Sequence, residues 1–188
     1  MDDADDHWLA RARDGDAQAF RCLVDAHARP LHRLCARIVH DPVLAEDAVQ
    51  EAFYRAWRGL AEFDGRSAFS TWLHRIAVNA ALELLRRNAR HRHELHETDD
   101  DDEGDFLAGF EGDAPGPQEH ARSAEINRCI QQQLGRMSAT ERAAFVMRHC
   151  EGESLDTIGA TLDLNIGQAK QAIFRAVRKL RGALQPLR

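Results

Sequence analysis

The sequence lacks any apolar run close to the roughly 20 residues that a membrane-spanning helix needs, although hydrophobic residues make up 44% of its 188 residues. Its acidic start, MDDADDHWLARARDGD, also lacks the apolar core of a secretory signal. We therefore expect a cytoplasmic protein with no direct membrane insertion. Charged residues make up 30% of the chain, which is typical of a soluble globular protein with ordinary small cores.

Motifs for metal binding, disulfide formation and catalysis are also missing. No C-x-x-C pair occurs among the four cysteines, three of which lie among apolar residues at helical spacing, so we expect reduced packing residues: Cys22, Cys35, Cys129 and Cys150. A group of three histidines favours a solvated basic helix end over a zinc site, because no cysteine accompanies it: His91, His93 and His96. There is no phosphate-binding glycine loop and no nucleophile–base set. The sequence predicts no enzyme, cofactor, metal site or small-molecule substrate.

The net charge of −6 hides a very uneven distribution. Residues 94–119 contain eleven acidic residues and no lysine or arginine, and subtracting this −11 from −6 leaves +5 for the remainder. Residues 1–93 are balanced at fourteen acidic and fourteen basic residues, whereas residues 166–188 hold six basic residues and no acidic one. A basic C-terminal segment beside a separate acidic one indicates a nucleic-acid binder despite the acidic net charge.

Apolar residues recur at helical spacing in the first half of the chain, and no segment alternates like a strand. The pattern predicts a first amphipathic helix around residues 17–24, and a second that begins at Pro30 and ends at Asp41–Pro42. A third and a fourth helix are predicted over residues 45–57 and 70–84. Four helices with short connections predict a compact bundle.

The second half of the chain is predicted to form a separate helical unit. Ser138 and Glu141 have the spacing of a capping box, in which both side chains bond to free backbone amides at a helix start. Ser154 can cap a short helix, after which the turn 163–166 leads into a long basic helix, the form of a helix-turn-helix. We therefore expect an all-α protein with two small helical domains, residues 1–93 and 121–188, joined by an acidic flexible linker at residues 94–120.

The last helix carries candidate DNA contacts. In a helix-turn-helix the second helix lies in the major groove, and the N-terminal half of this helix meets base edges. Glutamine pairs with adenine, lysine and arginine with guanine or phosphates, and phenylalanine can touch a thymine methyl group. A merely solvated basic face is the alternative, but one-sided charge after a capped helix and turn favours DNA binding. The predicted duplex-binding residues are Gln168, Lys170, Gln171, Phe174, Arg175, Arg178 and Lys179.

Motifs in both halves resemble those of extracytoplasmic-function sigma factors, RpoE-like members of the sigma-70 family. Three segments resemble the second conserved region of that family: A-E-D-x-x-Q-E-x-F at 45–53, F-x-G-x-S-x-F at 63–69 and T-W-L-x-R-I-A-x-N at 71–79. Two others are similar to its fourth region: L-x-x-M-S-x-x-E-R at 134–142 and E-G-x-S-L-D-x-I at 151–158. The resemblance covers nearly the whole chain except the linker and the first few residues.

The resemblance implies a protein that binds core RNA polymerase (the largest and second-largest subunits) and directs it to promoter DNA. The residues that match the polymerase-clamp contact are Asp47, Gln50, Glu51, Arg55 and Trp57. Those that match the capture of the melted −10 strand are Asp64, Arg66, Ser67, Phe69, Ser70, Thr71, Trp72, Arg75 and Asn79. A core role stays open for Trp57, Phe69 and Trp72. The residues that match phosphate contacts upstream are Arg86, Arg87, Arg90 and Arg92.

By the same resemblance the final helix reads the −35 element as duplex. Its start, Gly167-Gln-Ala-Lys-Gln-Ala172, departs from the family's usual Gly-Thr-Val-Lys/Arg-Ser-Arg, so the relatives' −35 preference does not carry over directly. The acidic linker either enters the polymerase channel or serves as a solubilising spacer, and charge alone does not separate these roles.

The family's regulation implies a separate anti-sigma factor, which can hold such a protein at the membrane, and a part in stress responses. Once released, the protein would be associated with the nucleoid. The alternative is a stand-alone helix-turn-helix regulator whose N-terminal bundle senses a ligand or dimerises. That alternative predicts duplex binding without polymerase.

Overall fold

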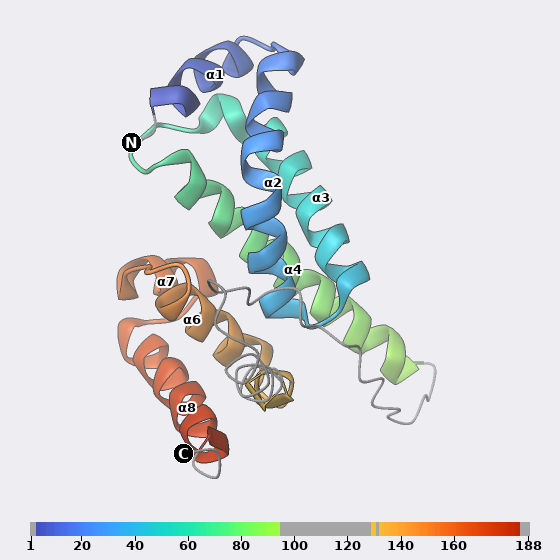
Figure 1. Cartoon of the computed structure of the whole chain (residues 1–188), viewed down its shortest axis with the longest axis vertical. Coiled ribbons are helices and arrows are strands. Elements are labelled where there is room, and N and C mark those ends of the chain that lie inside the picture. Colours follow the sequence, from blue (N-terminus) through green and yellow to red (C-terminus); the bar gives the residue numbers. More distant parts are fainter. Residues whose placement is uncertain (1–2, 95–128, 131, 185–188) are drawn as a thin grey trace, which may run out of the picture.

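The computed structural model describes residues 3–94, 129–130 and 132–184, and in these ranges the regular structure is helical, with no β-strand. Figure 1 shows two units: helices α1 to α4 above, and helices α6 to α8 below. None of the helices in the described ranges is long and apolar enough to cross a bilayer. The prediction of an all-α fold with two helical units is confirmed. The linker predicted at residues 94–120 lies outside the described residues, apart from Glu94.

Helix α1 (Asp3–Arg13) has no counterpart among the helices predicted from the sequence. It packs on α2 through buried Leu9 and Ala12, which lie three residues apart on one face. Asp16 joins the two helices, because it accepts hydrogen bonds from the Arg11 side chain and from the backbone N–H of Gln18 and Ala19. The backbone bond from Ala19, followed by the bond from Arg11, lowers the pKa of Asp16.

Helix α2 (Ala17–Val39) is continuous, so the prediction of two helices separated at Pro30 is wrong. A proline inside a helix removes one backbone hydrogen bond and crowds the carbonyl four residues before it. Burial on both sides of the proline offsets this cost, since Leu23, Leu31 and Leu34 are all fully buried on one stripe. The helix ends at His40, whose left-handed φ of 61° allows its N–H to donate to the Ala36 carbonyl.

Helix α3 (Pro42–Gly59) begins three residues before its predicted start, with Pro42 in its first turn and the Asp41 carboxylate accepting the Leu44 N–H. Four small residues that face α2 and α4 are fully buried: Ala45, Ala48, Ala52 and Ala56. Small side chains on this face allow α3 to approach its neighbours closely. The short 3-10 helix η1 (Leu60–Glu62) and a loop then lead into α4 (Phe69–Glu94).

The second unit has the predicted helix-turn-helix. Helix α6 (Ala139–His149) starts with the Ser138–Glu141 capping box, and α7 (Leu155–Leu162) starts at Ser154, whose hydroxyl accepts the Thr157 N–H. Asp163, with φ of 55°, ends α7, and α8 (Ile166–Leu184) follows. Residues 129–130 and 132–135 are also helical.

The two units pack against each other. Helix α6 contacts both α2 and α4, and α7 contacts α4. One continuous apolar core includes residues of both units, among them Leu34 and Ile38 of α2 and Val146 and Met147 of α6. The surfaces that face outward from this closed arrangement are therefore those on the far side of α3, around the loop before α4, and along α8 (Figure 1).

Candidate functional site

A hollow of about 480 Å³ lies between α3 and α4. Four of the five residues predicted to contact polymerase line it: Asp47, Gln50, Glu51 and Arg55. They share one face because the last three lie three, four and eight residues after Asp47 on α3. The structure thus places at one site four of the five side chains that the family resemblance indicated.

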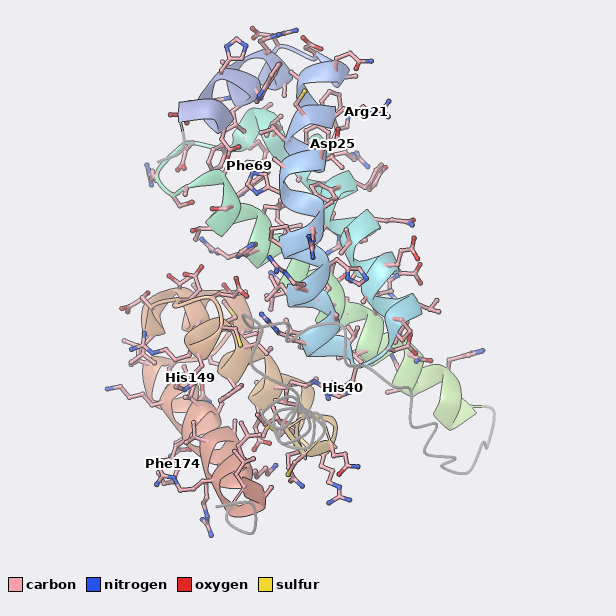
Figure 2. The ribbon with its side chains drawn as sticks, in the orientation of Figure 1. Arg21, Asp25, His40, Phe69, His149 and Phe174 are labelled. Carbon is pink, nitrogen blue, oxygen red and sulfur yellow. The ribbon has the colours of Figure 1, made fainter. Side chains whose placement is uncertain are left out.

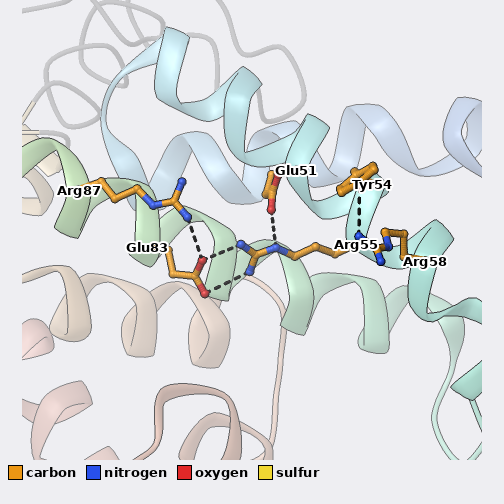
Figure 3. A network of polar contacts seen from close by, with 6 residues as sticks. All are labelled: Glu51, Tyr54, Arg55, Arg58, Glu83 and Arg87. Atoms are coloured by element: carbon orange, nitrogen blue, oxygen red, sulfur yellow. Dashed lines mark hydrogen bonds and ion pairs between the residues drawn. The ribbon is translucent and has the colours of Figure 1, made fainter.

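Arg55 forms the centre of a polar network at this hollow (Figure 3). Its Nε donates to Glu51 Oε1 at 2.6 Å, and its two terminal nitrogens donate to the Glu83 carboxylate of α4 at 3.1 and 2.6 Å. Arg87 lies 3.8 Å from the same carboxylate. The bond from Arg55 lowers the pKa of Glu83, and the two carboxylates raise that of Arg55, with Glu83 acting most strongly. Arg55 therefore already ties α3 to α4 in the free protein.

Helix α3 also exposes two aromatic side chains, of which Tyr54 lines the hollow and Trp57 does not. Trp57 is 36% exposed, and its ring lies 4.9 Å from that of Phe20, so one part packs on α2 and another faces solvent. Tyr54 is 56% exposed, lines the hollow, and accepts a hydrogen bond from Arg58 at 3.3 Å. Tyr54 was missed from the sequence, although its position one turn after Gln50 could have indicated it.

A second hollow, of about 410 Å³, lies beside the loop that precedes α4. It is lined by Ser67 of the loop and by Phe69 and Ser70 at the start of α4, three of the residues predicted to hold the melted strand. Asp64 accepts the Arg66 N–H at 3.0 Å and pairs with the Arg66 guanidinium at 3.1 Å, outside the hollow. The Arg66 side chain is 89% exposed, so the loop holds a cation at the surface.

The opposite wall of this hollow was not predicted. It comes from Asp5, Asp6 and Leu9 of α1 and His27 of α2. Asp5 and His27 lie 3.0 Å apart, and the His27 ring meets Phe69 edge-on with centroids 5.3 Å apart. The signal that could have revealed this wall is the apolar spacing Trp8, Leu9 and Ala12 within the acidic start.

Aromatic rings support the loop from beneath. Phe69 is buried and contacts Phe63 and Trp72, with ring centroids 6.1 and 5.8 Å apart. Trp72 is half-buried and lies 5.0 Å from Phe63. The structure therefore places Phe69 in the core, as the structural alternative anticipated, and leaves Trp72 partly exposed.

The remaining predicted strand contacts lie along α4. Thr71, Arg75 and Asn79 follow one another at intervals of four, so they form one row, with Thr71 and Arg75 half-buried and Asn79 exposed. At the far end of the helix the basic residues Arg86, Arg87 and Arg90 are exposed. The side chain of Arg92 lies outside the described residues.

Helix α8 exposes most of its predicted DNA-binding residues. Lys170, Gln171, Phe174 and Arg178 all face solvent, and Phe174 is 67% exposed. Figure 2 shows Phe174 projecting away from the rest of the molecule. Gln168 is also exposed, but its side-chain oxygen accepts the Asn165 N–H at 2.9 Å, while Asn165 accepts the Gln168 N–H. Gln168 thus helps to start the helix.

Glu141 of α6 binds the other two predicted DNA contacts. Its carboxylate lies 2.6 Å from Lys179 Nζ and 3.2 Å from Arg175 Nε, and it also completes the capping box with Ser138. Burial raises the pKa of Glu141, but the bonds from Lys179 and the Ser138 backbone outweigh it and lower the pKa overall. This residue was missed from the sequence as a partner of α8.

The described residues include no cluster of His, Cys, Asp and Glu suited to a metal ion. Of the group proposed as a histidine-rich helix end, His91 is exposed, and the side chains of the other two lie outside the described residues. The four cysteines are free; Cys35 is buried, and burial raises its pKa to about 12. A thiol with such a pKa stays protonated and behaves as a small apolar side chain.

Two family profiles match the chain in the order that the motifs suggested. The profile for Sigma-70 region 2 matches residues 23–91, and that for Sigma-70 region 4 matches residues 127–180. The RNA polymerase sigma-H factor of Pseudomonas aeruginosa is 35% identical over 97% of this chain and 95% of its own length. The chain is an extracytoplasmic-function sigma factor of the sigma-70 family.

Other relatives of this sigma factor carry the same group name. The ECF sigma factor SigW of Bacillus subtilis is 30% identical over 95% of this chain and 96% of its own length, and the ECF sigma-E factor of Escherichia coli is 32% identical over 95% and 93%. Sigma factors are initiation factors that regulate transcription, not enzymes. The family membership confirms the resemblance drawn from the motifs.

Solved structures match the fold of this sigma factor over nearly all of the chain. CnrH, in complex with the cytosolic domain of CnrY, is similar with a TM-score of 0.62 at 27% identity, covering 98% of this chain and 99% of CnrH. RpoE of Bartonella quintana, in complex with the anti-sigma factor NepR, gives a TM-score of 0.66 at 20% identity, covering 90% of this chain and 98% of RpoE. At this identity the similarity shows the fold alone.

Proposed function

We propose that this sigma factor binds core RNA polymerase through the α3–α4 face, holds the melted −10 strand at the loop before α4, and reads the −35 element as duplex with α8. The observation that carries the proposal is the outward row of α8. An exposed phenylalanine among lysine, arginine and glutamine has no packing role, and it suits a major groove that presents thymine methyl groups.

The loop before α4 supports the −10 assignment. A flipped base needs a recess, a ring to stack on and polar groups at its rim, and extrusion costs a few kcal/mol of stacking. The 410 Å³ hollow, the partly exposed ring of Trp72 and the surface cation Arg66 supply these features in the part of the first unit around this loop.

The hollow between α3 and α4 supports the polymerase assignment. It combines polar side chains with the exposed aromatic ring of Tyr54, and protein interfaces are enriched in aromatic residues and have polar rims. The domain limits 1–93, 94–120 and 121–188 form part of the same proposal. So do a separate anti-sigma factor and a cytoplasmic, nucleoid-associated location; the two similar structures contain complexes with CnrY and NepR.

Co-elution with bacterial core polymerase followed by transcription from a promoter library tests the proposal. Binding to core and new start sites are expected, and alignment of the transcribed promoters gives both elements. A chain that retards duplex DNA but never co-elutes with core would instead be a stand-alone regulator.

Two substitutions separate the assigned surfaces. Phe174→Ala should keep co-elution with core but lose transcription from promoters that depend on the −35 element. Trp57→Ala should weaken co-elution, whereas Ile166→Ala, at an exposed apolar position on α8 outside the predicted set, should leave it unchanged. If Trp57→Ala and Ile166→Ala behave alike, the α3 face is not the polymerase contact.

A further inference from the structure

Helix α8 exposes a second large apolar side chain besides Phe174. Ile166, the first residue of the helix, is 47% exposed, and Phe174 is 67% exposed. Among the described residues, the other exposed large apolar side chains all lie on α3: Val43, Tyr54 and Trp57. Such side chains therefore gather on the two helices that the proposed function assigns to macromolecular partners. Ile166 has no role in that function, yet it lies on the helix assigned to the −35 duplex.

Ile166, Lys170 and Phe174 follow one another at intervals of four residues, so they form a row along the exposed side of α8. A different side of the helix packs toward α6 and α7, with Ala169 and Ala172 buried there. This packing fixes the direction in which the row points. Eight residues correspond to about 12 Å along a helix axis. The row therefore has one apolar side chain at each end and a lysine between them.

The start of α8 holds Ile166 outward and engages its polar neighbours. The Leu164 N–H donates to the Gly159 carbonyl at 2.9 Å, which fixes the turn before the helix. The side-chain oxygens of Asn165 and Gln168 each accept the backbone N–H of the other residue at 2.9 Å. Bidentate reading of adenine requires the oxygen and the nitrogen of an amide together, and the cap fixes both amides on the backbone. Ile166 is therefore the side chain that the helix start presents to a duplex.

An apolar side chain in the major groove selects thymine, because thymine is the base that presents a methyl group there. The N-terminal residues of a recognition helix are the ones that meet base edges, and Ile166 is the first residue of α8. Residues 166–188 hold six basic residues and no acidic one, so the charge that attracts DNA lies on the same helix as both apolar side chains. A separation of about 12 Å spans at most about four base pairs, each of which rises about 3.4 Å.

We propose that Ile166 is a further specificity-determining residue, which reads a second thymine methyl group in the −35 duplex. This thymine lies at most about four base pairs from the one that Phe174 contacts. The duplex as ligand rests on the proposed function, whereas the selection of thymine at two positions goes beyond it. Apolar contacts of this kind bind thymine more tightly than uracil, which lacks the methyl group.

Replacement of single thymidines of the −35 element by deoxyuridine tests the proposal, because this change removes only the C5 methyl group of the base. The protein is the full chain in holoenzyme with core polymerase, and the promoters are those obtained from the library. Retardation of labelled duplex in gels reports the affinity. Loss of one buried methyl group should weaken binding about fourfold. The wild type should show this loss at two thymines.

Three variants assign the two thymines to side chains. Ile166→Ala should remove the sensitivity at one thymine and keep it at the other, and Phe174→Ala should do the reverse. Ile166→Val keeps a branched apolar side chain, so it should retain most of the preference for thymine. Lys170→Ala is the control for a general loss of DNA binding, because it should weaken binding to the thymine and uracil promoters by the same factor.

Two results would overturn the proposal. In the first, the wild type is sensitive to uracil at no more than one position. In the second, Ile166→Ala keeps the wild-type ratio of thymine to uracil binding at every position, even if it binds all promoters more weakly, so Ile166 supports the helix without reading a base. Failure of the proposed function looks different. The wild type would then form no holoenzyme, or it would bind promoters equally well after the whole −35 element is replaced.

Discussion

Arg55 lies at the proposed polymerase surface and is also bonded to carboxylates on two helices of its own chain. A partner that uses this guanidinium must compete with Glu51 and Glu83 or bind the three groups as a set. The geometry favours binding of the three groups together, because Arg55 makes two side-by-side hydrogen bonds to Glu83. The lining residues Asp47 and Gln50 are exposed at the rim.

Replacement of Arg55 by methionine keeps the length of the side chain and removes its charge. Partly exposed ion pairs contribute little, so we expect Arg55→Met to cost about 1 kcal/mol, a fall in Tm of about 2–4 °C for a chain of this size. Because the pKa of Glu83 is lowered in the fold, its contribution is present above the ordinary value of 4.5 and is lost as the pH falls through the folded value. The Tm difference from the wild type should therefore narrow below about pH 4.5 in thermal melts monitored by circular dichroism. A difference that stays constant into acid would exclude the Arg55–Glu83 bond as its source.

At the scale of residues, the sequence predicted well which side chains of α8 face solvent, but it did not predict which residues elsewhere in the chain they contact. Removing the apolar stripe of α8 left the side chains that the structure exposes, such as Gln171 and Phe174. Glu141 could not be assigned to Lys179 in the same way, because the two lie 38 residues apart and meet only through the packing of α6 on α8. Local periodicity carries no information on such pairs.

Glu141 sets how many cations of α8 are available for phosphates. Glu141→Gln keeps a side chain suited to the capping box but should release Arg175 and Lys179. We expect tighter binding to a promoter duplex and a slope of log K against log salt that is steeper by up to about 2, one per additional phosphate contact. Titrations at several salt concentrations measure both quantities.

Asp156→Asn provides the control for Glu141→Gln, since it makes the same change of charge at an exposed position of α7. Its salt slope should match that of the wild type. Equal slopes for all three proteins would mean that Arg175 and Lys179 do not reach the backbone of the duplex.

At the scale of elements, Gly159 determines how closely the turn after α7 can approach the helix. A Cβ at this position would lie 2.7 Å from the Leu164 carbonyl oxygen, which is backbone and cannot move aside freely. Gly159→Ala should therefore destabilise the chain by about 1–3 kcal/mol, as overpacking does, and should weaken duplex binding. Gly182→Ala on α8, where nothing lies within 4 Å, should instead be neutral or stabilise slightly in the same urea titration. The reverse order would contradict the structure of the turn.

Sequence patterns predicted most of the elements and failed at two of them for physical reasons. The fixed φ of Pro30 suits a first helical turn and predicts a helix start there, but burial of the stripe around it favours one continuous helix. Helix α1 was missed because its acidic residues hid a short apolar face that is stable only when packed on α2. Both errors arise where tertiary burial overrides local preference.

At the scale of the whole molecule, His40 joins the first unit to the second. It lies at the end of α2 (Figure 2), with its Nδ1 4.0 Å from the position that a Cβ on Gly135 would take, and the charge of the buried Arg142 acts on it. Burial, and then the charge of Arg142, lowers the pKa of His40 to about 4. Burial also lowers the pKa of Arg142 to about 10, so Arg142 stays charged at neutral pH while His40 stays neutral.

Acid should therefore weaken the closed molecule through His40. Its neutral form is favoured in the fold, so this stability is fully present above the ordinary pKa of 6.5 and is lost as the pH falls from 6.5 towards 4, by about 3 kcal/mol at most. His40→Asn accepts the left-handed φ and removes the titration of the side chain, so its free energy of unfolding in urea should fall less over that pH range.

Glu151, whose pKa is raised chiefly by burial, changes the stability in the opposite sense as the pH falls, but it is common to both proteins. His32→Asn, an exposed site on the same helix, should follow the wild type; a His40→Asn profile parallel to that of the wild type would exclude His40 as the source.

The docking of the two units could not be predicted from the sequence. It depends on Arg37, His74 and Glu151, which belong to three separate helices or turns and show no shared spacing. Each half of the chain has its own regular pattern, and those patterns specify the helices but not how one unit lies on the other.

The buried alanines of α3 separate packing inside the molecule from contact with a partner on the outer face of the helix. The alanine methyl groups that face α2 and α4 have no rotamers to rearrange, so substitutions on the outer face leave the packing with these two helices intact. Natural variation can then alter the outer face of α3 one side chain at a time, changing its affinity for a partner without a loss of folded protein. A bundle built in this way can diverge into many factors that compete for one shared partner while keeping the same scaffold.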